Sequence, residues 1–316
     1  MIEAQQLHKA FKTRTGTVKA VDGVDFRAGD GRITGLLGPN GAGKTTALRM
    51  LYTLMKPDSG QVRVDGIDAS ADPAGVRRVL GVLPDARGIY KRLTARENIA
   101  YFGQLHGLSR KQIAERTRAL SQQLDMDDIL DRRTEGFSQG QRTKTAIARA
   151  LVHDPRNVIL DEPTNGLDPS QIQHMRSLVR ELARDATLII STHVLQEVEA
   201  VCSRVLIMRG GQLALDSALD AIGRPKRLLV TLDCAPEEAR PVLAQIEGVT
   251  GVEAWNGDAG LRHFALSAAD PQALAPLVAK TLGGQPWNLY ALAPERRDLE
   301  DLFGAVTLEQ MEVAHV

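Results

Sequence analysis

Residues 33–50 of the chain read ITGLLGPNGAGKTTALRM. The run from Ile33 to Leu37 is short and apolar, as a buried strand is, and the last residues have the composition of a helix. The intervening residues 38–45 match the pattern G-x-x-x-x-G-K-[ST]. Glycines let backbone N–H groups turn towards phosphate oxygens, and the N-terminus of the following helix favours negative charge. We therefore predict a phosphate-binding loop between a strand and a helix of an α/β fold.

Each residue type in this loop has a predicted role. Lys44 supplies a positive charge for the β- and γ-phosphates, and Thr45 offers its hydroxyl to Mg²⁺. A glycine-rich turn that only caps a helix is the alternative, but a strand before the loop and a helix after it favour nucleotide binding. The predicted nucleotide-binding residues are Gly38, Pro39, Asn40, Gly41, Ala42, Gly43, Lys44, Thr45 and Thr46.

Two later apolar runs end in residues that can act on a phosphate. Residues 157–160 run into Asp161 and Glu162, and residues 187–190 are followed by Ser191, Thr192 and His193. The carboxyl ends of parallel strands form the ligand-binding edge of α/β sheets. We predict that Asp161 holds Mg²⁺ through water, that Glu162 polarises the attacking water and that His193 contacts the γ-phosphate. Taken alone, such residues are more often solvated turns or structural groups, and the phosphate-binding loop favours the catalytic interpretation.

The periodicity of the chain indicates two domains. Strand-like and helix-like stretches alternate up to about residue 217, which is typical of an α/β layer structure with a mostly parallel sheet. A helical pattern interrupts this alternation between residues 93 and 135, and it predicts an inserted helical subdomain. The basic stretch 223–227 contains Gly and Pro and predicts a linker. The expected domains are therefore residues 1–222, with a mixed-sheet core, and residues 226–316.

The predicted C-terminal domain has the order βαββαβ, which fits a small ferredoxin-like α+β sandwich. Asn256, Gly257 and Asp258 predict a hairpin between its two middle strands, and a final helix is expected from Asp298. This part of the sequence has no cluster of His, Cys or carboxylate residues, so we expect a role in dimer support or regulation. The expected elements are strands at 228–234, 251–256, 261–267 and 287–292, and helices at 236–246 and 272–282.

Composition excludes several classes of protein. The 316 residues include 39 basic and 39 acidic side chains, so no global positive charge attracts nucleic acid or an anionic membrane surface. The longest apolar runs are far shorter than the roughly 20 residues that span a bilayer, and the N-terminus lacks the pattern of a secretion signal. We expect a cytosolic chain whose two cysteines, Cys202 and Cys234, are reduced thiols.

A further motif, FSQGQR at residues 137–142, precedes a predicted helix. Ser138 and Gln141 have the spacing of a capping box, which a helix N-terminus needs in any case. The motif also resembles the signature of ATP-binding cassette (ABC) ATPases. The phosphate-binding loop, the acidic strand end, residues 165–168 and His193 follow the order of the Walker A, Walker B, D-loop and H-loop motifs of that family. The resemblance covers residues 1–222 and implies a P-loop ABC ATPase domain that binds ATP with Mg²⁺.

The same resemblance implies a homodimer that closes head to tail. Each ATP would lie between Lys44 of one copy and the signature residues Ser138, Gln139, Gly140 and Gln141 of the other, with Asp168 in the D-loop. Phe11 stands where the family places an aromatic side chain on adenine, and a plain core aromatic is the alternative. Two positions depart from the family. Asp85 stands where the family usually has a glutamine, and its carboxylate would approach Mg²⁺ through water. Gln139 stands in the signature where glycine is the commonest residue.

The stretch GVLPDARGIYKRLTARENIAYFGQLHGL and the added C-terminal domain resemble the ATPases of ABC-2-type exporters, most of all the sodium-efflux (NatA-type) ATPases. This implies a separate membrane permease that docks near residues 87–90 and the helix from Ala95, and a peripheral location on the cytoplasmic face of the inner membrane. Export of drugs, polysaccharide or lipid is the alternative. A non-transport ABC ATPase that acts on nucleic acid is the rival class, which the single cassette, the absence of sustained heptads and the zero net charge disfavour.

Overall fold

The computed structural model describes residues 1–14, 16–85, 88–222, 227–257, 260–295 and 299–304, and the chain divides into two compact units. One unit begins at Met1 and ends at Leu219, and the other begins at Asp220, close to the boundary expected from the sequence. Of the expected linker at residues 223–227, the first four residues lie outside the described residues, whereas Arg227 is the first residue of a strand. Across the described ranges, no helix has the length and apolar character needed to span a bilayer.

A six-stranded sheet forms the centre of the first unit, in the order β10-β9-β3-β8-β7-β6. Neighbouring strands from β9 to β6 are parallel, and β10 pairs antiparallel with β9. Three of these strands are buried over their whole length, as parallel strands covered by helices on both faces are. The strands are β3 (Ile33–Leu37), β6 (Leu80–Leu83), β7 (Asn157–Asp161), β8 (Thr187–Thr192), β9 (Arg204–Arg209) and β10 (Gln212–Ala218).

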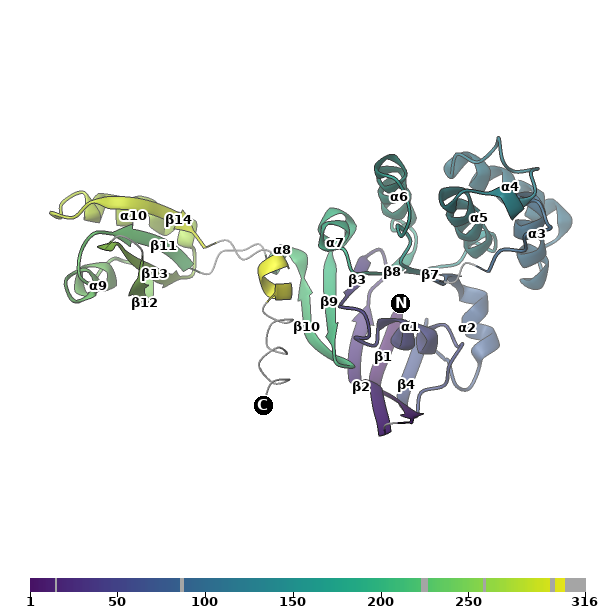
Figure 1. Ribbon diagram of the computed structural model, residues 1–316, viewed down its shortest axis with the longest axis horizontal. Coiled ribbons are helices and arrows are strands. Elements are labelled where there is room, and N and C mark those ends of the chain that lie inside the picture. Colours follow the sequence, from purple (N-terminus) through teal and green to yellow (C-terminus); the bar gives the residue numbers. More distant parts are fainter. Residues whose placement is uncertain (15, 86–87, 223–226, 258–259, 296–298, 305–316) are drawn as a thin grey trace. The chain divides into compact units, whose positions relative to one another are not determined.

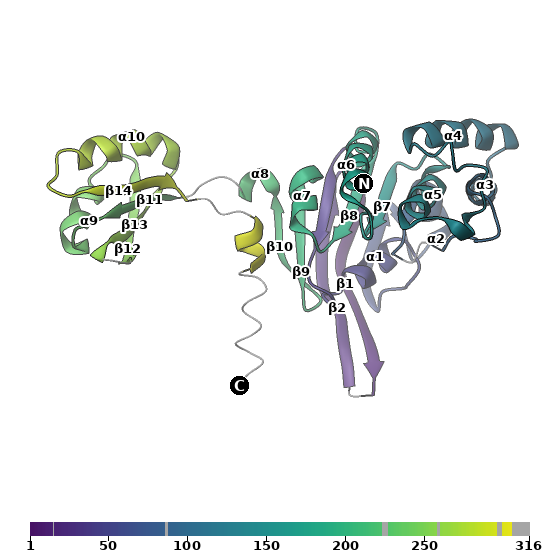
Figure 2. The ribbon, with the colours of Figure 1, turned by 45° about the horizontal axis from the view of Figure 1, so that its top comes forward.

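The two faces of this sheet belong to different cores. Ile159 of β7 packs on one face with Leu48 of helix α1, whereas the adjacent Leu160 packs on the other face with Leu178 of helix α6. This alternation follows from the two-residue period of a strand. Figures 1 and 2 show the helices distributed on both sides of the sheet. The helices that follow strands of the unit are α1 (Lys44–Leu51), α2 (Pro73–Val79), α6 (Pro169–Leu182), α7 (Leu195–Val201) and α8 (Leu219–Ile222).

A second sheet in the first unit is antiparallel, with the order β2-β1-β4-β5. Val62 of this sheet shares a core with Leu48 of α1, so α1 lies between the two sheets. The sequence analysis anticipated strands in this region but not their separation into a sheet of their own. The strands are β1 (Ile2–Thr13), β2 (Gly16–Ala28), β4 (Ser59–Val64) and β5 (Ile67–Asp68).

The predicted helical subdomain is present. It contains α3 (Ala95–Leu105), α4 (Arg110–Gln123) and the short 3-10 helix η1 (Thr134–Gly136), and the next helix, α5 (Gln139–Leu151), packs against it. Thr94 and Ser109 begin α3 and α4 with capping boxes, which satisfy backbone N–H groups at the helix ends. Ile99, Leu120 and Ile147 pack in one core. Figure 1 shows these helices grouped beside the sheet.

The second unit has the predicted order of strands and helices. Its sheet has the order β12-β13-β11-β14, and all neighbouring strands are antiparallel. Both helices share a core with the sheet, as in a ferredoxin-like sandwich. Gly257 N–H donates to the carbonyl of Leu261 at 3.0 Å, where the hairpin was expected, whereas Asp258 lies outside the described residues. The elements are β11 (Arg227–Leu232), α9 (Pro236–Ala244), β12 (Val249–Asn256), β13 (Arg262–Ala268), α10 (Pro271–Leu282) and β14 (Leu289–Pro294).

The end of the chain is described only in part. Residues 299–304 are helical, in the region where the sequence predicts a final helix. The expected start of that helix, Asp298, lies outside the described residues, as do residues 305–316. The prediction therefore agrees with the six residues that can be compared.

Candidate nucleotide-binding site

The glycine-rich loop connects β3 to α1 and leads directly into Lys44. Gly43 has a φ of +103°, and a Cβ atom at this position would lie 2.2 Å from the carbonyl oxygen of Ala20, so only glycine fits. Lys44 is 7% exposed, and its Nζ donates to the carbonyls of Gly38 at 2.6 Å and Pro39 at 3.2 Å. Burial lowers the pKa of Lys44, and the charge of Glu162 opposes this shift. The buried ammonium group therefore lies where a phosphate would neutralise it.

Asp161 ends β7 and is 1% exposed. One carboxylate oxygen, Oδ1, accepts a hydrogen bond from the Ser191 hydroxyl. The other, Oδ2, is buried and has no hydrogen-bond partner among the described residues. Burial raises the pKa of Asp161, the Ser191 hydrogen bond opposes the shift, and the charge of Asp85 adds to it. A buried carboxylate oxygen without a partner is suited to bind a metal ion, because the ion would compensate its desolvation.

These residues fit Mg²⁺, which binds hard oxygen ligands. The Asp161 carboxylate and the Thr45 hydroxyl are such ligands, and Mg²⁺ sites in proteins commonly use one or two carboxylates together with substrate phosphates and water. Within the described part of the chain, no three His, Cys, Asp or Glu side chains are placed to hold a metal ion together. The phosphates of the nucleotide would therefore have to complete the site.

Glu162 and His193 form a hydrogen-bonded pair at the ends of neighbouring strands. His193 Nδ1 lies 3.0 Å from Glu162 Oε2 and 3.1 Å from Oε1. Glu162 has a φ of +48°, which is strained for a residue other than glycine, and its N–H donates to the carbonyl of Ser191 at 3.1 Å. The parallel pairing of β7 and β8 sets this arrangement, because Asp161 is level with Ser191. The imidazole thus holds the Glu162 carboxylate in place.

These groups meet around a cleft of about 360 Å³. The structure brings Lys44, Thr45, Asp85, Glu162 and His193 together there, although they come from separate parts of the sequence. Two lining residues, Ala20 and Asn165, were not predicted to line it. Ala20 belongs to no recognisable motif, so the sequence could not have predicted its position. Asn165 belongs to the motif at residues 165–168 and follows Glu162 closely in the sequence, so its place in the cleft could have been predicted. The lining residues are Ala20, Asn40, Gly41, Ala42, Gly43, Lys44, Thr45, Thr46, Asp85, Glu162, Asn165 and His193.

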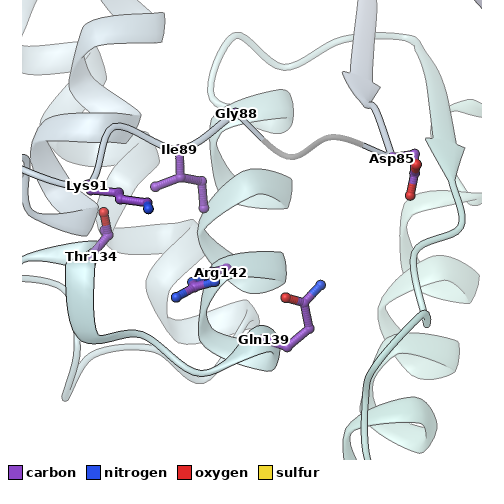
Figure 3. Close-up of a pocket in the computed structure, with 7 residues that line it drawn as sticks. All are labelled: Asp85, Gly88, Ile89, Lys91, Thr134, Gln139 and Arg142. Carbon is purple, nitrogen blue, oxygen red and sulfur yellow. The ribbon is translucent and has the colours of Figure 1, made fainter.

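Asp85 also lines a second pocket, of about 380 Å³, which Figure 3 shows. In that view Asp85 stands at one end, while Gln139 and Arg142 extend from α5 on the other side and Lys91 and Thr134 lie beyond them. Asp85 therefore lies between the nucleotide cleft and the helical subdomain. The charge of Asp85 reaches the Asp161 carboxylate, whose pKa it raises. The approach of Asp85 to Mg²⁺ through water stays a prediction.

The signature residues form the first turn of α5. The Gln141 N–H donates to Ser138 Oγ at 3.3 Å, and the Ser138 N–H donates to Gln141 Oε1 at 3.1 Å, so the capping box is present. Asp168 caps the N-terminus of α6, accepting from the Gln171 N–H at 2.9 Å and from the Ser170 hydroxyl at 2.7 Å. These hydrogen bonds hold the pKa of Asp168 below its usual value. Both segments thus present helix N-termini, which attract anions.

Phe11 lies on β1, opposite Val18 of β2, and is 39% exposed. The ammonium group of Lys9 lies 6.0 Å from the centre of its ring. Phe11 is not among the residues that line the nucleotide cleft. It is therefore not a core aromatic, and its predicted contact with adenine stays a prediction.

Comparison with known proteins places this geometry in a family. The profile described as "ABC transporter" matches residues 21–165, which include the glycine-rich loop, the signature and the acidic strand end. The chain is 41% identical over 229 residues to the ABC transporter ATP-binding protein NatA of Bacillus subtilis, covering 72% of this chain and 93% of that protein. It is 36% identical over 233 residues to the bacitracin transport ATP-binding protein BcrA of Bacillus licheniformis, covering 73% and 75%.

A solved structure has the same fold over the first unit. The dimeric structure of MJ0796, a bacterial ABC transporter cassette, superposes with a TM-score of 0.65 at 23% identity, covering 69% of this chain and 99% of that one. The fold resemblance agrees with the α/β architecture and inserted helical subdomain described above. The geometry of the site and these similarities identify the chain as a member of the ABC transporter family, an ATP-binding subunit that hydrolyses ATP.

Proposed function

We propose that the chain is the ATPase of an exporter in which two copies close head to tail on two ATP molecules and drive a separate ABC-2-type membrane permease. The observation that carries the proposal is the convergence of Lys44, Asp161, Glu162 and His193 at the carboxyl ends of adjacent parallel strands. The complex would place the chain on the cytoplasmic face of the inner membrane.

The proposed chemistry follows from these positions. Lys44 gives up its two carbonyl contacts and binds the β- and γ-phosphates as a point charge. Glu162, held by His193, accepts a hydrogen bond from the attacking water and aligns it with the γ-phosphorus. The His193 side chain is 52% exposed, and we propose that it also contacts the γ-phosphate. Bound Mg²⁺, held by Thr45 and Asp161 with Asp85 nearby, would supply positive charge to the transferring phosphoryl group.

Two copies are proposed because the signature lies outside the nucleotide cleft of its own chain. Ser138, Gly140 and Asp168 do not line that cleft. Their helix N-termini are suited to an anion, and a second chain would bring one. The dimeric cassette of the same fold supports this arrangement. Phe11 is proposed to stack on the adenine of the ATP bound by its own chain.

A groove between the sheet and the helical subdomain is the proposed permease site. It encloses a cavity of about 300 Å³, lined by residues that include Leu54, Phe102 and Arg149. Large apolar side chains are exposed near these elements, among them Leu54 at 69% and Leu105 at 64%. Tyr90, in the segment predicted to dock, forms an edge-on ring pair with Tyr101 at 5.4 Å. Arg87, the other end of that predicted segment, lies outside the described residues.

Sodium extrusion is the proposed transport activity, and it rests on the resemblance of residues 81–108 to sodium-efflux ATPases. The similarity to a bacitracin transport ATPase supports the alternative of drug export. Polysaccharide or lipid export would use the same ATPase, because the transport path is built by the permease. A nucleic-acid role has no comparable support, since the formal net charge is zero.

The test reconstitutes the chain with the permease encoded beside its gene in proteoliposomes. ATP turnover and ion movement are measured with Na⁺, K⁺ and a panel of drugs and lipids, and Glu162→Gln is the inactive control. Turnover stimulated by Na⁺, dependent on Glu162 and accompanied by Na⁺ movement supports the full proposal. Glu162-dependent turnover that responds to a drug or lipid but not to Na⁺ would retain the exporter and exclude sodium as substrate.

The docking site is tested by assembly. Tyr90→Ala combined with Leu54→Ser, at the exposed leucine that lines the groove, should reduce co-purification with the permease. Val18→Ser, at another exposed apolar position on β2, should not. Unchanged assembly of the double variant would refute the groove as the permease site.

A further inference from the structure

One side chain that the sequence motifs do not single out lies directly against the signature. Gln171 stands in the first turn of α6, and a Cβ atom placed on Gly140 would lie 2.5 Å from Gln171 Oε1 and 2.6 Å from Nε2. Such distances are far inside van der Waals contact, so the Gln171 amide occupies the space beside Gly140. Gly140 is buried, although it lies in the first turn of a helix.

The position of this amide is unusual for its place in the helix. Asp168 and Gln171 have the spacing of a capping box, and Asp168 does accept from the Gln171 N–H at 2.9 Å. In the corresponding pair of α5, the Gln141 side chain returns to the Ser138 N–H at 3.1 Å and closes the box. In α6 only the Asp168 half of the box is formed, and the Gln171 side chain lies on Gly140 instead. The side chain therefore joins two helices rather than capping one.

A second glutamine makes the reverse contact. Gln139 begins α5, and its Cγ would lie 3.0 Å from a Cβ atom placed on Gly166, in the turn before α6. Gln171 of α6 therefore packs on Gly140 of α5, and Gln139 of α5 packs on Gly166 in the turn before α6. Because both glycines lack a side chain, the two segments approach closely. The signature turn and the turn at residues 165–168 are held in a fixed relation by this reciprocal packing.

We propose that Gln171 is a positioning residue for the ATP of the partner subunit. It acts by filling the space beside Gly140, which sets the distance between the N-terminus of α5 and Asp168 and lets both reach the partner nucleotide together. The inference rests on the proposed head-to-tail dimer. The affinity of the isolated chain for ATP does not involve Gln171, because Gln171 does not line the nucleotide cleft of its own chain.

The test measures ATP-induced dimerisation of the full chain in the Glu162→Gln background, where turnover does not consume the ATP. Gln171→Ala should raise the ATP concentration for half-maximal dimerisation about tenfold, which corresponds to roughly 1.4 kcal/mol. Gln171→Met, which keeps the length of the side chain but not its amide, should stay within about twofold of the parent, because packing rather than hydrogen bonding is proposed. Gln173→Ala, on the same helix and exposed, is the matched control.

Two further measurements separate positioning from general damage. In the active chain, Gln171→Ala should raise the KM for ATP and leave kcat within about twofold at saturating ATP. Binding of a fluorescent ATP analogue to monomers at low protein concentration should be unchanged. A change in monomer binding would show that Gln171 acts in its own cleft and would overturn the proposal.

Enlarging the side chain at position 140 while shortening the one at position 171 tests the contact independently. Gly140→Ala should weaken dimerisation, because its methyl group displaces the Gln171 amide. Gly140→Ala combined with Gln171→Ala should dimerise better than Gly140→Ala alone, since the methyl group takes part of the vacated space; strictly multiplicative effects would refute the contact.

The possible failures are distinguishable. If the Glu162→Gln parent stays monomeric with ATP, the head-to-tail dimer is refuted and the inference falls with it. If the parent dimerises and Gln171→Ala dimerises at the same ATP concentration, the inference alone is refuted.

Discussion

The two units of the chain contain the same kinds of secondary structure but differ in where their polar groups gather. In the first unit, Lys44, Asp161 and His193 follow the ends of parallel strands that lie side by side. In the second unit the strands are antiparallel, and Arg227 pairs instead with Glu253 and Glu295, each at 2.6 Å. Parallel strands place all their carboxyl ends at one edge of a sheet, whereas antiparallel strands alternate them between two edges. Topology therefore determines whether residues at strand ends can converge on one ligand.

The comparison predicts that replacing a glutamate by glutamine greatly lowers ATP turnover in the first unit and leaves it unchanged in the second. Glu162→Gln should lower ATP turnover by about 10²- to 10⁴-fold, because the carboxylate that aligns water is removed, while ATP affinity stays nearly unchanged. Phosphate release measures the first quantity and binding of a fluorescent nucleotide the second. Glu253→Gln, in the second unit, should turn over ATP at the parental rate, and a comparable loss there would break the comparison.

A substitution in the core of the second unit should lower the stability of that unit without changing ATP binding. Phe264 is fully buried in the second unit, and Phe264→Ala should lower the free energy of unfolding of that unit by about 3–5 kcal/mol. Both tryptophans of the chain, Trp255 and Trp287, lie in this unit, so their fluorescence during urea titration reports its unfolding. ATP affinity should be retained. A parallel loss of nucleotide binding would show that the first unit depends on the second for its fold.

A half-buried histidine of the first unit, His153, takes no part in the proposed chemistry and provides a further comparison. Burial lowers the pKa of His153 to about 4, and its ring stacks on His106 with centres 3.6 Å apart. Its neutral form is favoured by folding, so this stabilisation is complete above the unfolded pKa near 6.5 and is lost as pH falls towards 4.

Between pH 7.5 and 4.5, the parent should therefore lose about 2–3 kcal/mol of stability that His153→Gln does not lose. Gln keeps a donor for the carbonyl of Leu80, which His153 Nε2 contacts at 3.3 Å. Calorimetry of the first unit measures the difference, and tryptophan fluorescence of the second unit is the internal control. Equal pH dependence in parent and variant would contradict the assignment.

The smallest effect is expected from removing the second unit. Deletion of the residues after Arg224 should leave ATP affinity within about twofold, because every residue that lines the nucleotide cleft precedes the deletion. Dimerisation or turnover should change, since we expect the second unit to support or regulate the dimer. Isothermal titration measures the affinity, and a clear loss of ATP binding would refute the domain boundary.

Much of the candidate site was predictable from short motifs. The glycine-rich loop, the acidic strand end and the capping box at Ser138 each depend on neighbours in sequence, and the structure forms the loop and the helix cap as expected. Glu162 was assigned from its place after a strand, but its hydrogen bond to His193 joins residues 31 positions apart. Pairing of β7 with β8 creates that contact, and no local pattern contains it.

The separate antiparallel sheet and the role of Gln171 were not predictable in the same way. Strand periodicity shows which residues face a core but not which core, so β1, β2 and β4 gave no sign that they form their own sheet. Gln171 has the spacing of a capping residue, and only the approach of α5 to α6 shows that its amide lies on Gly140.

Local sequence alone determined the phosphate-binding loop, the helix caps, the order of elements in both units and the residue types available for catalysis, because these depend on interactions over a few residues. Tertiary structure decided which of those residues share a cleft, how Asp161 is left with a buried unpaired oxygen, and how two glutamines join the signature to the following turn. Contacts between distant segments arise from the packing of whole strands and helices, and the free energy of that packing is not contained in any single motif.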